Sequence, residues 1–514
     1  MLQGDTAQPS SRGADGAPAD RISTVVLAAG EGTRMRSATP KVLHRLGGRP
    51  LVEHAVRAAA GVDPEDLVVV VGHGREAVGE HLDGVAAALG REVRTAVQEE
   101  QLGTGHAVAC GLSRLSAART GTVLVSYGDV PLLDAATLRG LLAEHRDAGN
   151  AVTVLSAEVD DPTGYGRLLR DAHGQVTGIV EQKDATAEQA AITEVNSGVY
   201  AFDAAVLDDA LRRLSTDNAQ GELYLTDVLA IAREDGRRVS ALVCPDPWLV
   251  EGVNDRVQLS RLGAELNRRL LLRWMRAGVT VTDPGSVWLD CDVELDRDVV
   301  LEPGVQLRAG TTVGEGAAIG PDTTLTGCAI RPGATVVRSH GEGAEVGPGA
   351  SVGPFAFLRP GTSLGADGKI GTFVETKNAA IGAGTKIPHL SYVGDATIGE
   401  RSNIGAATVF VNYDGVAKHH TTIGSHARTG ADNMFVAPVE VGDGAYTAAG
   451  SVIVQDVPPG AMAVARGRQR NIEGWVARRR PGTAADQAAG AALADAEPTA
   501  DQRRPTTDVP REGR

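Results

Sequence analysis

A six-residue repeat between Leu295 and Val454 limits the folds that are open to this chain. Aliphatic residues recur every six positions, and glycine often follows directly, as in Val313-Gly314 and Ile370-Gly371. This spacing fits neither an amphipathic helix, whose period is about 3.6 residues, nor a half-exposed strand, whose period is about two. It fits a coil of three short strands per turn, in which each strand places one aliphatic residue on the axis and glycine makes the corners. A disordered glycine-rich tract is the alternative, but it would not keep aliphatic residues in register. The registers are Leu295, Leu301, Leu307, Val313, Ile319 and Leu325; Val346, Val352, Leu358, Leu364 and Ile370; Ile381, Ile387 and Val393; Ile398 and Ile404.

Length and composition indicate a globular protein with more than one domain. The chain has 514 residues, which is too long for one typical core. Its formal net charge of -15 argues against general binding of nucleic acid or anionic membranes, which requires a basic surface. Four cysteines lie far apart without a CxxC spacing, so we expect free thiols in a reducing compartment, with no disulfide framework and no cysteine metal site.

Changes in composition divide the chain into five segments. Residues 1–20 and 476–514 are rich in Ala, Gly, Pro and charge, and we expect both tails to be disordered. Neither a secretory signal nor an apolar run of membrane-spanning length is present, which favours a cytoplasmic protein. Strands and helices alternate over 21–253, leucines at helical spacing predict a linker helix within 254–277, and the repeat domain occupies 278–475.

The segment 21–253 predicts an α/β domain. Ser23–Leu27, Leu67–Val71, Thr122–Ser126 and Ala151–Ala157 read as apolar strands, and Leu51–Ala60 reads as a helix. Continuous apolar strands that alternate with helices are typical of a parallel sheet covered on both faces. Ligands bind beyond the carboxyl ends of such strands, so the loops after Leu27 and Ser126 are the expected positions of a site.

The loop after the first strand has the composition of a phosphate-binding loop. Leu27, Ala28, Ala29 and Gly30 lead into Glu31-Gly32-Thr33-Arg34, and Lys41 follows shortly afterwards. Small residues let backbone N–H groups approach phosphates, and Arg34 and Lys41 supply mobile positive charge. The loop has neither the Gly-Lys-Ser/Thr of a Walker A loop nor the third glycine of a dinucleotide fingerprint. A Gly-x-Gly alone is weak evidence and is often a simple turn.

Several further motifs make the assignment specific. From Ile22 to about Trp475 the chain resembles the nucleotide-sugar pyrophosphorylases, and among them the bifunctional N-acetylglucosamine-1-phosphate uridyltransferases / glucosamine-1-phosphate N-acetyltransferases. The matching stretches are Leu27–Met35, Pro40–His44, Gln101–His106, Tyr127–Leu132, Gly164–Arg167, Glu181, Asn196–Gly198, Glu222–Asp227 and Glu251–Asn254. The resemblance implies a Rossmann-like nucleotidyltransferase domain joined by a long helix to a left-handed parallel β-helix. It also implies synthesis of UDP-N-acetylglucosamine for peptidoglycan and other cell-envelope polysaccharides.

Uridyl transfer requires Mg²⁺ and positive charge around the phosphates more than it requires a protein nucleophile. Asp129 follows a buried strand, where its carboxylate can hold the hard cation. The resemblance adds the Asn254 amide oxygen as a second Mg²⁺ ligand. The alternative is that Asp129 and Asn254 only cap the loop and the helix that follow them.

The resemblance implies roles for the other residues of this half. The catalytic cations would be Arg34 and Lys41. Tyr127 could bind UDP-N-acetylglucosamine or could be a packing residue. Binding of UTP and of the product would fall to Leu27, Ala28, Ala29, Gly30, Lys41, Gln98, Gly103, Thr104, Gly128, Asp129 and Asn254, and binding of the amino sugar to Gly166, Glu181 and Asn196.

One polar stretch interrupts the repeat. Ile404 and Ile423 are 19 positions apart, one more than three hexads, so the register breaks between them. Asn412, Tyr413 and Lys418 lie in this interval. We expect an excluded loop, because such loops commonly carry the binding surface of repeat proteins. His389 lies shortly before it, and a neutral imidazole suits a general base that takes a proton from an amine. A lone histidine is more often structural, and the resemblance is what favours catalysis.

By resemblance, His389 is the base of acetyl transfer. Arg359, Lys377, Tyr392 and Asn403 would bind glucosamine 1-phosphate, and contacts to acetyl-CoA would come from Ala406, Asn412, Tyr413, Lys418, Ala431, Ala449 and Arg466. The chain departs from the family at two positions. Ala431 replaces a common serine, which removes one hydroxyl contact to the coenzyme, and Ala407 replaces a common glycine near the thioester.

Three functions are compatible with these observations. The first is the bifunctional enzyme, which uses glucosamine 1-phosphate, acetyl-CoA, N-acetylglucosamine 1-phosphate and UTP. Hexapeptide β-helices of this kind characteristically form trimers, and closed cyclic symmetry is common among soluble oligomers, so we expect a homotrimer. The second is a monofunctional sugar-phosphate nucleotidyltransferase whose β-helix serves only for oligomerisation, and the third is a scaffold without activity. The presence of Arg34 and Asp129 argues against the third function, and that of His389 against the second.

Overall fold

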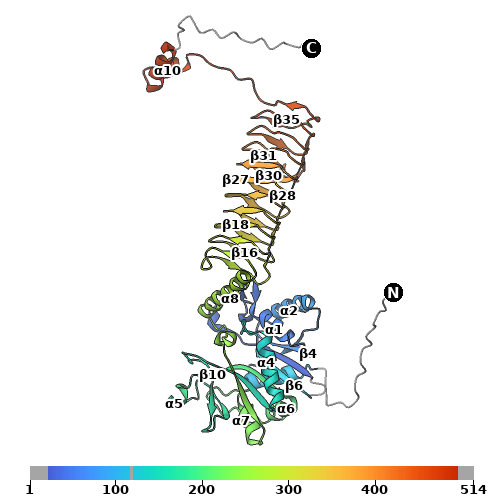
Figure 1. Cartoon of the computed structure of the whole chain (residues 1–514), viewed down its shortest axis with the longest axis vertical. Coiled ribbons are helices and arrows are strands. Elements are labelled where there is room, and N and C mark those ends of the chain that lie inside the picture. Colours follow the sequence, from blue (N-terminus) through green and yellow to red (C-terminus); the bar gives the residue numbers. More distant parts are fainter. Residues whose placement is uncertain (1–20, 116–119, 496–514) are drawn as a thin grey trace, which may run out of the picture.

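The protein consists of an α/β unit, a long helix and a β-helix that follow one another along an elongated molecule (Figure 1). The structure is a computed structural model that describes residues 21–115 and 120–495. Both tails are expected to be disordered. Residues 1–20 and the end of the segment 476–514 lie outside the described residues, so this expectation is not tested there. No helix of the described part is long and apolar enough to cross a membrane. All four cysteines are free, as their spacing predicts.

The α/β unit is built on a nine-stranded sheet, whose central path runs β11-β7-β10-β6-β1-β4-β5. Strand β1 pairs in parallel with β4 on one side and β6 on the other, so the chain changes direction of winding at β1. The strands are β1 (Ile22–Ala28), β4 (Asp66–Val71), β5 (Arg94–Val97), β6 (Thr122–Tyr127), β7 (Val152–Glu158), β8 (Arg167–Arg170), β9 (Val176–Val180), β10 (Glu194–Asp203) and β11 (Val239–Cys244), with a separate hairpin of β2 (Arg45–Leu46) and β3 (Arg49–Pro50).

Helices cover both faces of this sheet, which confirms the predicted fold class. Val25 and Val26 point to opposite faces of β1 and belong to different hydrophobic clusters, as the alternation of a strand requires. The helices are α1 (Leu51–Ala60), α2 (Arg75–Leu89), α3 (Thr104–Leu112), α4 (Ala135–Asp147), α5 (Ala187–Ala190), α6 (Ala204–Leu211) and α7 (Asp227–Glu234), and the 3-10 turns are η1 (Thr33–Met35), η2 (Lys41–Leu43) and η3 (Pro247–Val250).

One strand runs against the expectation of a parallel sheet. β10 is antiparallel to both β6 and β7. Between β7 and β10 the chain makes the β8–β9 hairpin and the short helix α5, without the crossover helix that would return it in the parallel direction. This excursion places β8 beside the start of β10, at the pairing of Val195 with Arg167.

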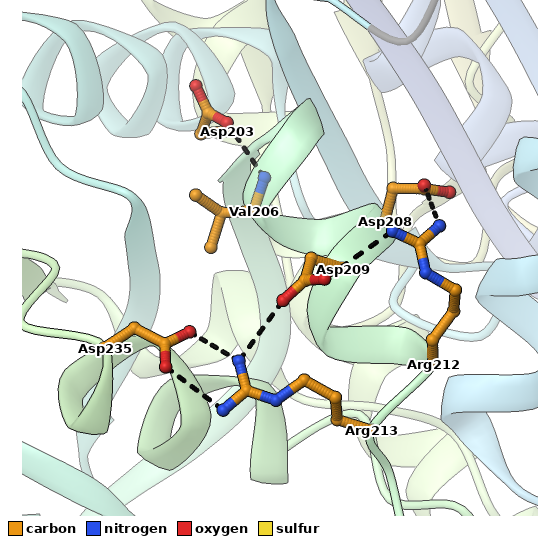
Figure 2. Close-up of polar contacts among 7 residues, drawn as sticks. All are labelled: Asp203, Val206, Asp208, Asp209, Arg212, Arg213 and Asp235. Carbon is orange, nitrogen blue, oxygen red and sulfur yellow. Dashed lines mark hydrogen bonds and ion pairs between the residues drawn. The ribbon is translucent and has the colours of Figure 1, made fainter.

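Polar contacts hold the two helices at the edge of this unit (Figure 2). The Asp203 carboxylate caps α6 by accepting from the Val206 N–H at 3.0 Å. At the other end of α6, Arg213 donates to Asp209 at 3.2 Å and to Asp235, which follows α7, at 2.5 and 3.1 Å. Because these side chains are exposed, the network fixes the relative position of α6 and α7 more than it adds stability.

The β-helix has the three-strand coil that the hexad spacing predicts. Strands pair in parallel with the strand one coil further on, as Leu301 does with Ile319. The hexad aliphatics are buried and form one continuous cluster along the axis. One face carries β12 (Thr280–Val281), β15 (Val300–Leu301), β18 (Ala318–Gly320), β21 (Thr335–Val337), β24 (Ser351–Val352), β27 (Lys369–Thr372) and β29 (Lys386–His389).

The other two faces share one continuous 17-stranded sheet. Asn378 bends β28 and Asp395 bends β30 with a positive φ, a backbone conformation that Asn and Asp tolerate better than most residues. The strands are β13 (Trp288–Leu289), β14 (Glu294–Leu295), β16 (Gln306–Arg308), β17 (Thr312–Val313), β19 (Thr324–Thr326), β20 (Ala329–Ile330), β22 (His340–Glu342), β23 (Glu345–Val346), β25 (Phe357–Leu358), β26 (Ser363–Leu364), β28 (Glu375–Ile381), β30 (Tyr392–Ile398), β31 (Val409–Val411), β32 (Thr421–Ile423), β33 (Met434–Val436), β34 (Val439–Val441) and β36 (Val452–Ile453); β35 (Tyr446–Thr447) and β37 (Met462–Ala463) pair separately.

Helix α8 (Arg256–Arg276) does more than connect the two units. Leu270 and Leu271 are buried in the same cluster as the axis of the β-helix. The buried Asn267 side chain donates to Val287 O at 2.7 Å and accepts from the Leu289 N–H at 3.0 Å, and so satisfies the backbone of the first coil. The helix therefore closes the open end of the β-helix.

The C-terminal segment differs from its expectation. Helices α9 (Trp475–Arg479) and α10 (Ala484–Asp495) form where the composition predicts disorder. The reason is that alanine, the residue with the highest helix propensity, makes up most of α10. Neither helix buries a residue within this chain.

Candidate active sites

The first candidate site lies where β1 and β6 end side by side. The Gly128 N–H donates to Leu27 O at 2.8 Å, which joins the loop after β6 to the end of β1. This edge is the switch point of the sheet, the usual position of ligands in open α/β folds. Two connected cavities of about 320 and 330 Å³ open there, and Thr104, Tyr127, Asp129, Glu222 and Asn254 line both.

Four of the residues expected to act on phosphates meet between the two cavities. The Lys41 ammonium donates to the Asp129 carboxylate, and it lies 3.4 Å from the Asn254 amide oxygen. Arg34 donates to the same Asn254 oxygen at 2.9 Å. The Lys41 and Asp129 side chains are only 13% and 16% exposed. Residues from three distant stretches of the sequence thus form one compact charged cluster.

A glycine allows the phosphate-binding loop to lie in close contact with Lys41. Gly32 has a φ of +65°, and a Cβ at this position would collide with the Cβ of Lys41. The loop therefore needs glycine for both its backbone conformation and its contact with Lys41.

The same cluster provides oxygen ligands for a hard cation. Asp129 Oδ2 and Asn254 Oδ1 already converge on one positive charge, the Lys41 ammonium. Within residues 21–115 and 120–495 no group of three or more His, Cys, Asp or Glu side chains could hold a metal alone. One carboxylate and one amide oxygen are the partial ligand set typical of Mg²⁺ in phosphoryl-transfer sites, where waters and substrate phosphates complete the coordination. The residues present therefore fit Mg²⁺.

The first cavity contains the residues predicted for the nucleotide. Its lining includes Leu27, Ala28, Ala29, Gly30, Gln98, Gly103 and Thr104. Gln98 is buried, and its amide donates to Gly103 O at 3.1 Å. Sequence reasoning missed Gln101, which lines this cavity and donates to Ala29 O at 3.0 Å. Its position directly before Leu102-Gly103-Thr104 was the available signal.

The second cavity contains the residues predicted for the amino sugar. Gly166, Glu181, Asn196 and Tyr127 line it together. Burial raises the pKa of the Glu181 carboxyl, with smaller contributions from nearby acidic groups. The Asn196 side-chain oxygen accepts from the Gly198 N–H and the Tyr200 hydroxyl, both at 2.9 Å, so its amide N–H₂ is the end left for a ligand.

Sequence reasoning assigned no role to three further residues of this cavity. Tyr165, Glu222 and Thr226 line it, and each lies inside a motif that the sequence analysis identifies. The Thr226 hydroxyl lies 3.4 Å from the Glu181 carboxylate. Tyr127 packs against Gly198 and is partly buried, and this burial raises the pKa of its hydroxyl.

The second candidate site lies on the β-helix around three cations, two from successive coils and one from the excluded loop. Lys377 and Lys418 lie side by side, and the hydrogen bond and charge of Lys418, together with the charge of Arg359, lower the pKa of the Lys377 ammonium. Arg359 also donates to Glu375 at 2.9 Å. Like charges held this close are unfavourable until an anion neutralises them, so the cluster is suited to a phosphate.

Asp395 organises this cluster. Its two carboxylate oxygens accept from Asn378 at 2.7 Å and from Asn412 at 2.5 Å. Burial alone would raise the pKa of Asp395, but these hydrogen bonds and the charges of Lys418 and Lys377 hold it below its ordinary value. Asn412 also lies 3.4 Å from the Tyr392 hydroxyl. Sequence reasoning missed Asp395, although it directly follows Val393-Gly394.

The predicted loop is excluded from the coil. Ala396 pairs with Ala379 in one direction and only with Thr421 in the other, which leaves the intervening residues outside the regular strands. Tyr413 and Lys418 pair as the base of a small hairpin, and Asp414 holds its turn by accepting from the Ala417 N–H at 2.7 Å. The hairpin carries Lys418 back to Lys377.

His389 lies at the neighbouring corner of the coil. It is the last residue of β29, it is exposed, and no described residue hydrogen-bonds to its imidazole. The corner Leu390-Ser391 separates it from Tyr392, which begins the next face. The Tyr392 ring extends along that face, because its hydroxyl reaches Gly394 and Asn412. The Tyr392 hydroxyl thus lies beside Asn412, which hydrogen-bonds to Asp395 of the cation cluster.

Four of the residues predicted for the coenzyme form a line that starts at His389: Ala406, Ala431, Ala449 and Arg466. The other three, Asn412, Tyr413 and Lys418, lie instead in the cluster around Asp395 and Lys377 or on the hairpin beside it. Backbone hydrogen bonds connect corresponding corners of successive coils: Ala407 N to His389 O at 3.3 Å, Asp432 N to Ala406 O at 2.7 Å, and Gly450 N to Ala431 O at 2.8 Å. Arg466 donates to Ala449 O at 3.0 Å and extends the line by one coil. Coils stack about 4.8 Å apart, so the line is long and narrow, with small side chains throughout. Asn403 lies on the same face as His389, through its pairing with Lys386.

Comparison with known proteins relates both units to one set of relatives. Residues 24–192 match the MobA-like NTP transferase domain. The bifunctional protein GlmU of Corynebacterium efficiens is 61% identical over 468 residues, which cover 91% of this chain and 96% of that relative. The bifunctional protein GlmU of Kineococcus radiotolerans is 63% identical over 472 residues, 92% of this chain and 95% of the relative. That of Rhodococcus jostii is 63% identical over 475 residues, with the same coverage.

Proposed function

The chain belongs to the family of bifunctional GlmU proteins, and we propose that its two sites divide the synthesis of UDP-N-acetylglucosamine between them. The enzyme is a uridyltransferase and an acetyltransferase. In our assignment, the β-helix site acetylates glucosamine 1-phosphate, and the α/β site transfers UMP to the acetylated product. The convergence of Lys41, Asp129 and Asn254 at the mouth of the sheet carries the assignment of the α/β site.

Uridyl transfer uses the cluster between the two cavities. A phosphate oxygen of N-acetylglucosamine 1-phosphate in the second cavity attacks the α-phosphorus of UTP in the first. A new P–O bond forms, the bond between the α-phosphorus and the bridging oxygen breaks, and pyrophosphate leaves with its electron pair. Arg34 and Lys41 stabilise the charge that develops on the phosphate oxygens, because they already lie where the cavities meet.

Asp129 and Asn254 would hold Mg²⁺ for this step, since their oxygens converge on one point. When bound, the ion neutralises phosphate charge and aligns UTP for in-line displacement. Lys41 remains close by through its Asn254 contact.

Acetyl transfer uses His389 and the cations beside it. In this proposal Arg359, Lys377 and Lys418 bind the phosphate of glucosamine 1-phosphate, and Tyr392, whose hydroxyl lies 3.4 Å from Asn412, contacts the sugar. The amine attacks the thioester carbon of acetyl-CoA. A C–N bond forms, His389 accepts the proton from nitrogen, and the C–S bond breaks with its electron pair going to sulfur. The coenzyme thiolate then takes up that proton and leaves as the free thiol. The pantetheine arm follows the line of small residues through Ala406, Ala431 and Ala449.

An exposed apolar edge next to His389 supports a homotrimer. Phe355, Phe373 and Leu390 occupy successive corners, each more than half exposed. The two phenylalanine rings stack with centroids 5.4 Å apart. All three residues have a positive φ, which is unfavourable for large side chains. Contiguous exposed apolar surface of this kind marks a protein interface, and packing against a second copy would bring that copy to the edge of the acetyltransferase site.

One experiment separates this function from the alternative of a nucleotidyltransferase with an inert β-helix. The purified chain is given glucosamine 1-phosphate, acetyl-CoA, UTP and Mg²⁺, and free thiol and pyrophosphate are followed separately. We expect thiol release without UTP, and pyrophosphate release only after acetylation. Pyrophosphate release from added N-acetylglucosamine 1-phosphate with no thiol release at all would support the alternative. Sedimentation of the same sample tests the trimer.

A further inference from the structure

Arg167 is a fully buried cation for which the reaction as described has no use. It ends the motif Gly164-Tyr165-Gly166-Arg167, and its side chain is among the most deeply buried of the described residues, at 1% exposure. No carboxylate of the described residues lies within ion-pair distance of its guanidinium, in contrast to Arg170 on the same strand, which pairs with Glu194. Asp161 is close enough for the charge of Arg167 to contribute to its lowered pKa, but the two side chains form no ion pair. Burial of a charge without a directly paired counter-charge is costly, so a purpose for it is expected.

The guanidinium of Arg167 is satisfied entirely by neutral oxygens. Its Nε and Nη2 both lie 3.3 Å from Ala190 O, at the end of helix α5. Nη2 also donates to the Gln182 side-chain oxygen at 2.7 Å, and Nη1 donates to Tyr165 O. The same Gln182 oxygen accepts from the Gly164 N–H at 3.0 Å. One planar side chain thereby cross-links the loop before β8, the turn after β9 and helix α5.

Two of these segments are walls of the second cavity. The loop contributes Gly164, Tyr165 and Gly166, and the turn contributes Glu181. A Cβ on Gly166 would lie 2.9 Å from Ile179 and 3.4 Å from the Glu181 carboxylate, so loop and turn are in close contact. The Asn196 N–H donates to Gly166 O at 2.9 Å, which connects the third wall. The third wall belongs to strand β10, but neither the loop nor the turn is a regular strand or helix that would hold its shape alone.

We propose that Arg167 is a positioning residue that fixes the amino-sugar cavity and thereby sets the affinity for the sugar 1-phosphate. The inference rests on the proposed function, in which this cavity holds N-acetylglucosamine 1-phosphate. Arg167 touches neither UTP nor the reacting atoms, because it does not line either cavity. A flat guanidinium with five N–H groups can reach three segments at once, whereas a lysine ammonium at this position cannot.

The test uses steady-state kinetics of uridyl transfer in the full-length enzyme. We expect Arg167→Met to raise KM for N-acetylglucosamine 1-phosphate at least tenfold while KM for UTP changes less than twofold. Arg167→Lys should give an intermediate value for the sugar phosphate. Gln182→Leu releases Gly164 without removing the arginine, so it should raise the same KM by a smaller factor. Acetyl transfer by the β-helix should be unchanged in all three variants, which controls for the amount of intact enzyme, while the KM for UTP controls for folding of the α/β unit.

Arg170→Met is the matched control. It removes an arginine from the same strand whose partner is Glu194 and which lines neither cavity, so both KM values should remain at their wild-type level. Equal increases in both KM values for the Arg167 and Gln182 variants would assign these residues to general stability and overturn the proposal. Unchanged KM values in folded variants would overturn it as well. Failure of the proposed function is distinct, because the wild type would then release no pyrophosphate from UTP and N-acetylglucosamine 1-phosphate. If Arg167→Met does not fold, Gln182→Leu decides the question.

Discussion

The Lys41 ammonium donates a hydrogen bond to the Asp129 carboxylate at the point where the two cavities of the α/β unit meet. Asp129 stands at the carboxyl end of β6, and Lys41 begins the 3-10 turn η2 after the phosphate-binding loop. The pair gives the site a positive charge for the phosphates and a negative charge for a metal ion in the same place. Both charges are shielded from solvent, so each acts more strongly than it would on the surface.

The first prediction concerns that carboxylate. Asp129→Ala should lower the rate of uridyl transfer by about 10²–10³-fold, the usual effect of removing one preorganised electrostatic contact. Acetyl transfer should continue, because it takes place on the β-helix. Pyrophosphate release measured at limiting and at saturating Mg²⁺ provides the test. A folded Asp129→Ala enzyme with the wild-type dependence on Mg²⁺ would show that the metal binds elsewhere.

The second prediction concerns the cations of the β-helix. Lys377→Met should raise KM for glucosamine 1-phosphate about 10–100-fold, as expected for a lost hydrogen bond between charged groups. KM for acetyl-CoA should change little, because the coenzyme line starts at the other corner. Lys369→Met, which removes an exposed lysine from the face of β27, is the control. The assignment fails if both lysine variants behave alike.

The third prediction concerns pH and stability. Burial, with a smaller effect of Arg146, lowers the pKa of His145 to about 4, and its Nδ1 lies 3.0 Å from the Thr153 hydroxyl. The unfolded chain would bind a proton near the ordinary value of about 6.5, so it takes up protons first as the pH falls. The free energy of unfolding of the α/β unit should therefore be constant above pH 6.5 and decline between about pH 6.5 and 4, by up to about 3 kcal/mol.

Denaturant unfolding across this pH range measures that effect. His145→Gln should flatten the decline, whereas His173→Gln, in an exposed turn, should leave it in place. An unaltered slope in His145→Gln would assign the pH dependence to other groups.

The fold of this chain is more predictable from its sequence than the side-chain contacts of its sites. The hexad spacing predicts the coil because each aliphatic residue has one position to fill on the axis, and Leu301, Ile319 and Val336 fill it. The reversed direction of β10 could not be predicted, because it depends on whether the β8–β9 segment makes a hairpin or a crossover.

The unpredicted residues share a physical reason. Arg167 and Asp395 act through contacts with segments distant in the sequence, and no local pattern distinguishes them from an arginine in a strand or an aspartate in a turn. Arg34 and Lys41 were easier to propose as catalytic cations, because they lie in or directly after the glycine-rich loop and within motifs that carry the family resemblance. The alanine-rich composition of α10 was interpreted as a sign of disorder, although alanine has the highest helix propensity.

The fourth prediction concerns the linker helix. Because Leu270 and Leu271 pack into the axis of the β-helix, a fragment that starts at Arg256 should be more stable than one that starts at Gly278. Burial of a leucine side chain contributes about 1.5–3 kcal/mol, so the difference should be several kcal/mol. Thermal unfolding of the two fragments, both ending at Trp475, measures it. Equal stability of the two fragments would show that α8 only connects the two units.

In the proposed function, two independent sites on one chain carry out consecutive reactions, and His389 is the base of the first. The most direct measurement follows thiol release and pyrophosphate release in parallel for His389→Ala, with His420→Ala as the matched control on the same domain and trimer content determined for both. A positioned imidazole contributes about 10²–10⁴-fold, so His389→Ala should lose thiol release by that factor. It should release pyrophosphate from UTP and N-acetylglucosamine 1-phosphate at the wild-type rate. Retained thiol release in His389→Ala together with its loss in His420→Ala would contradict the account.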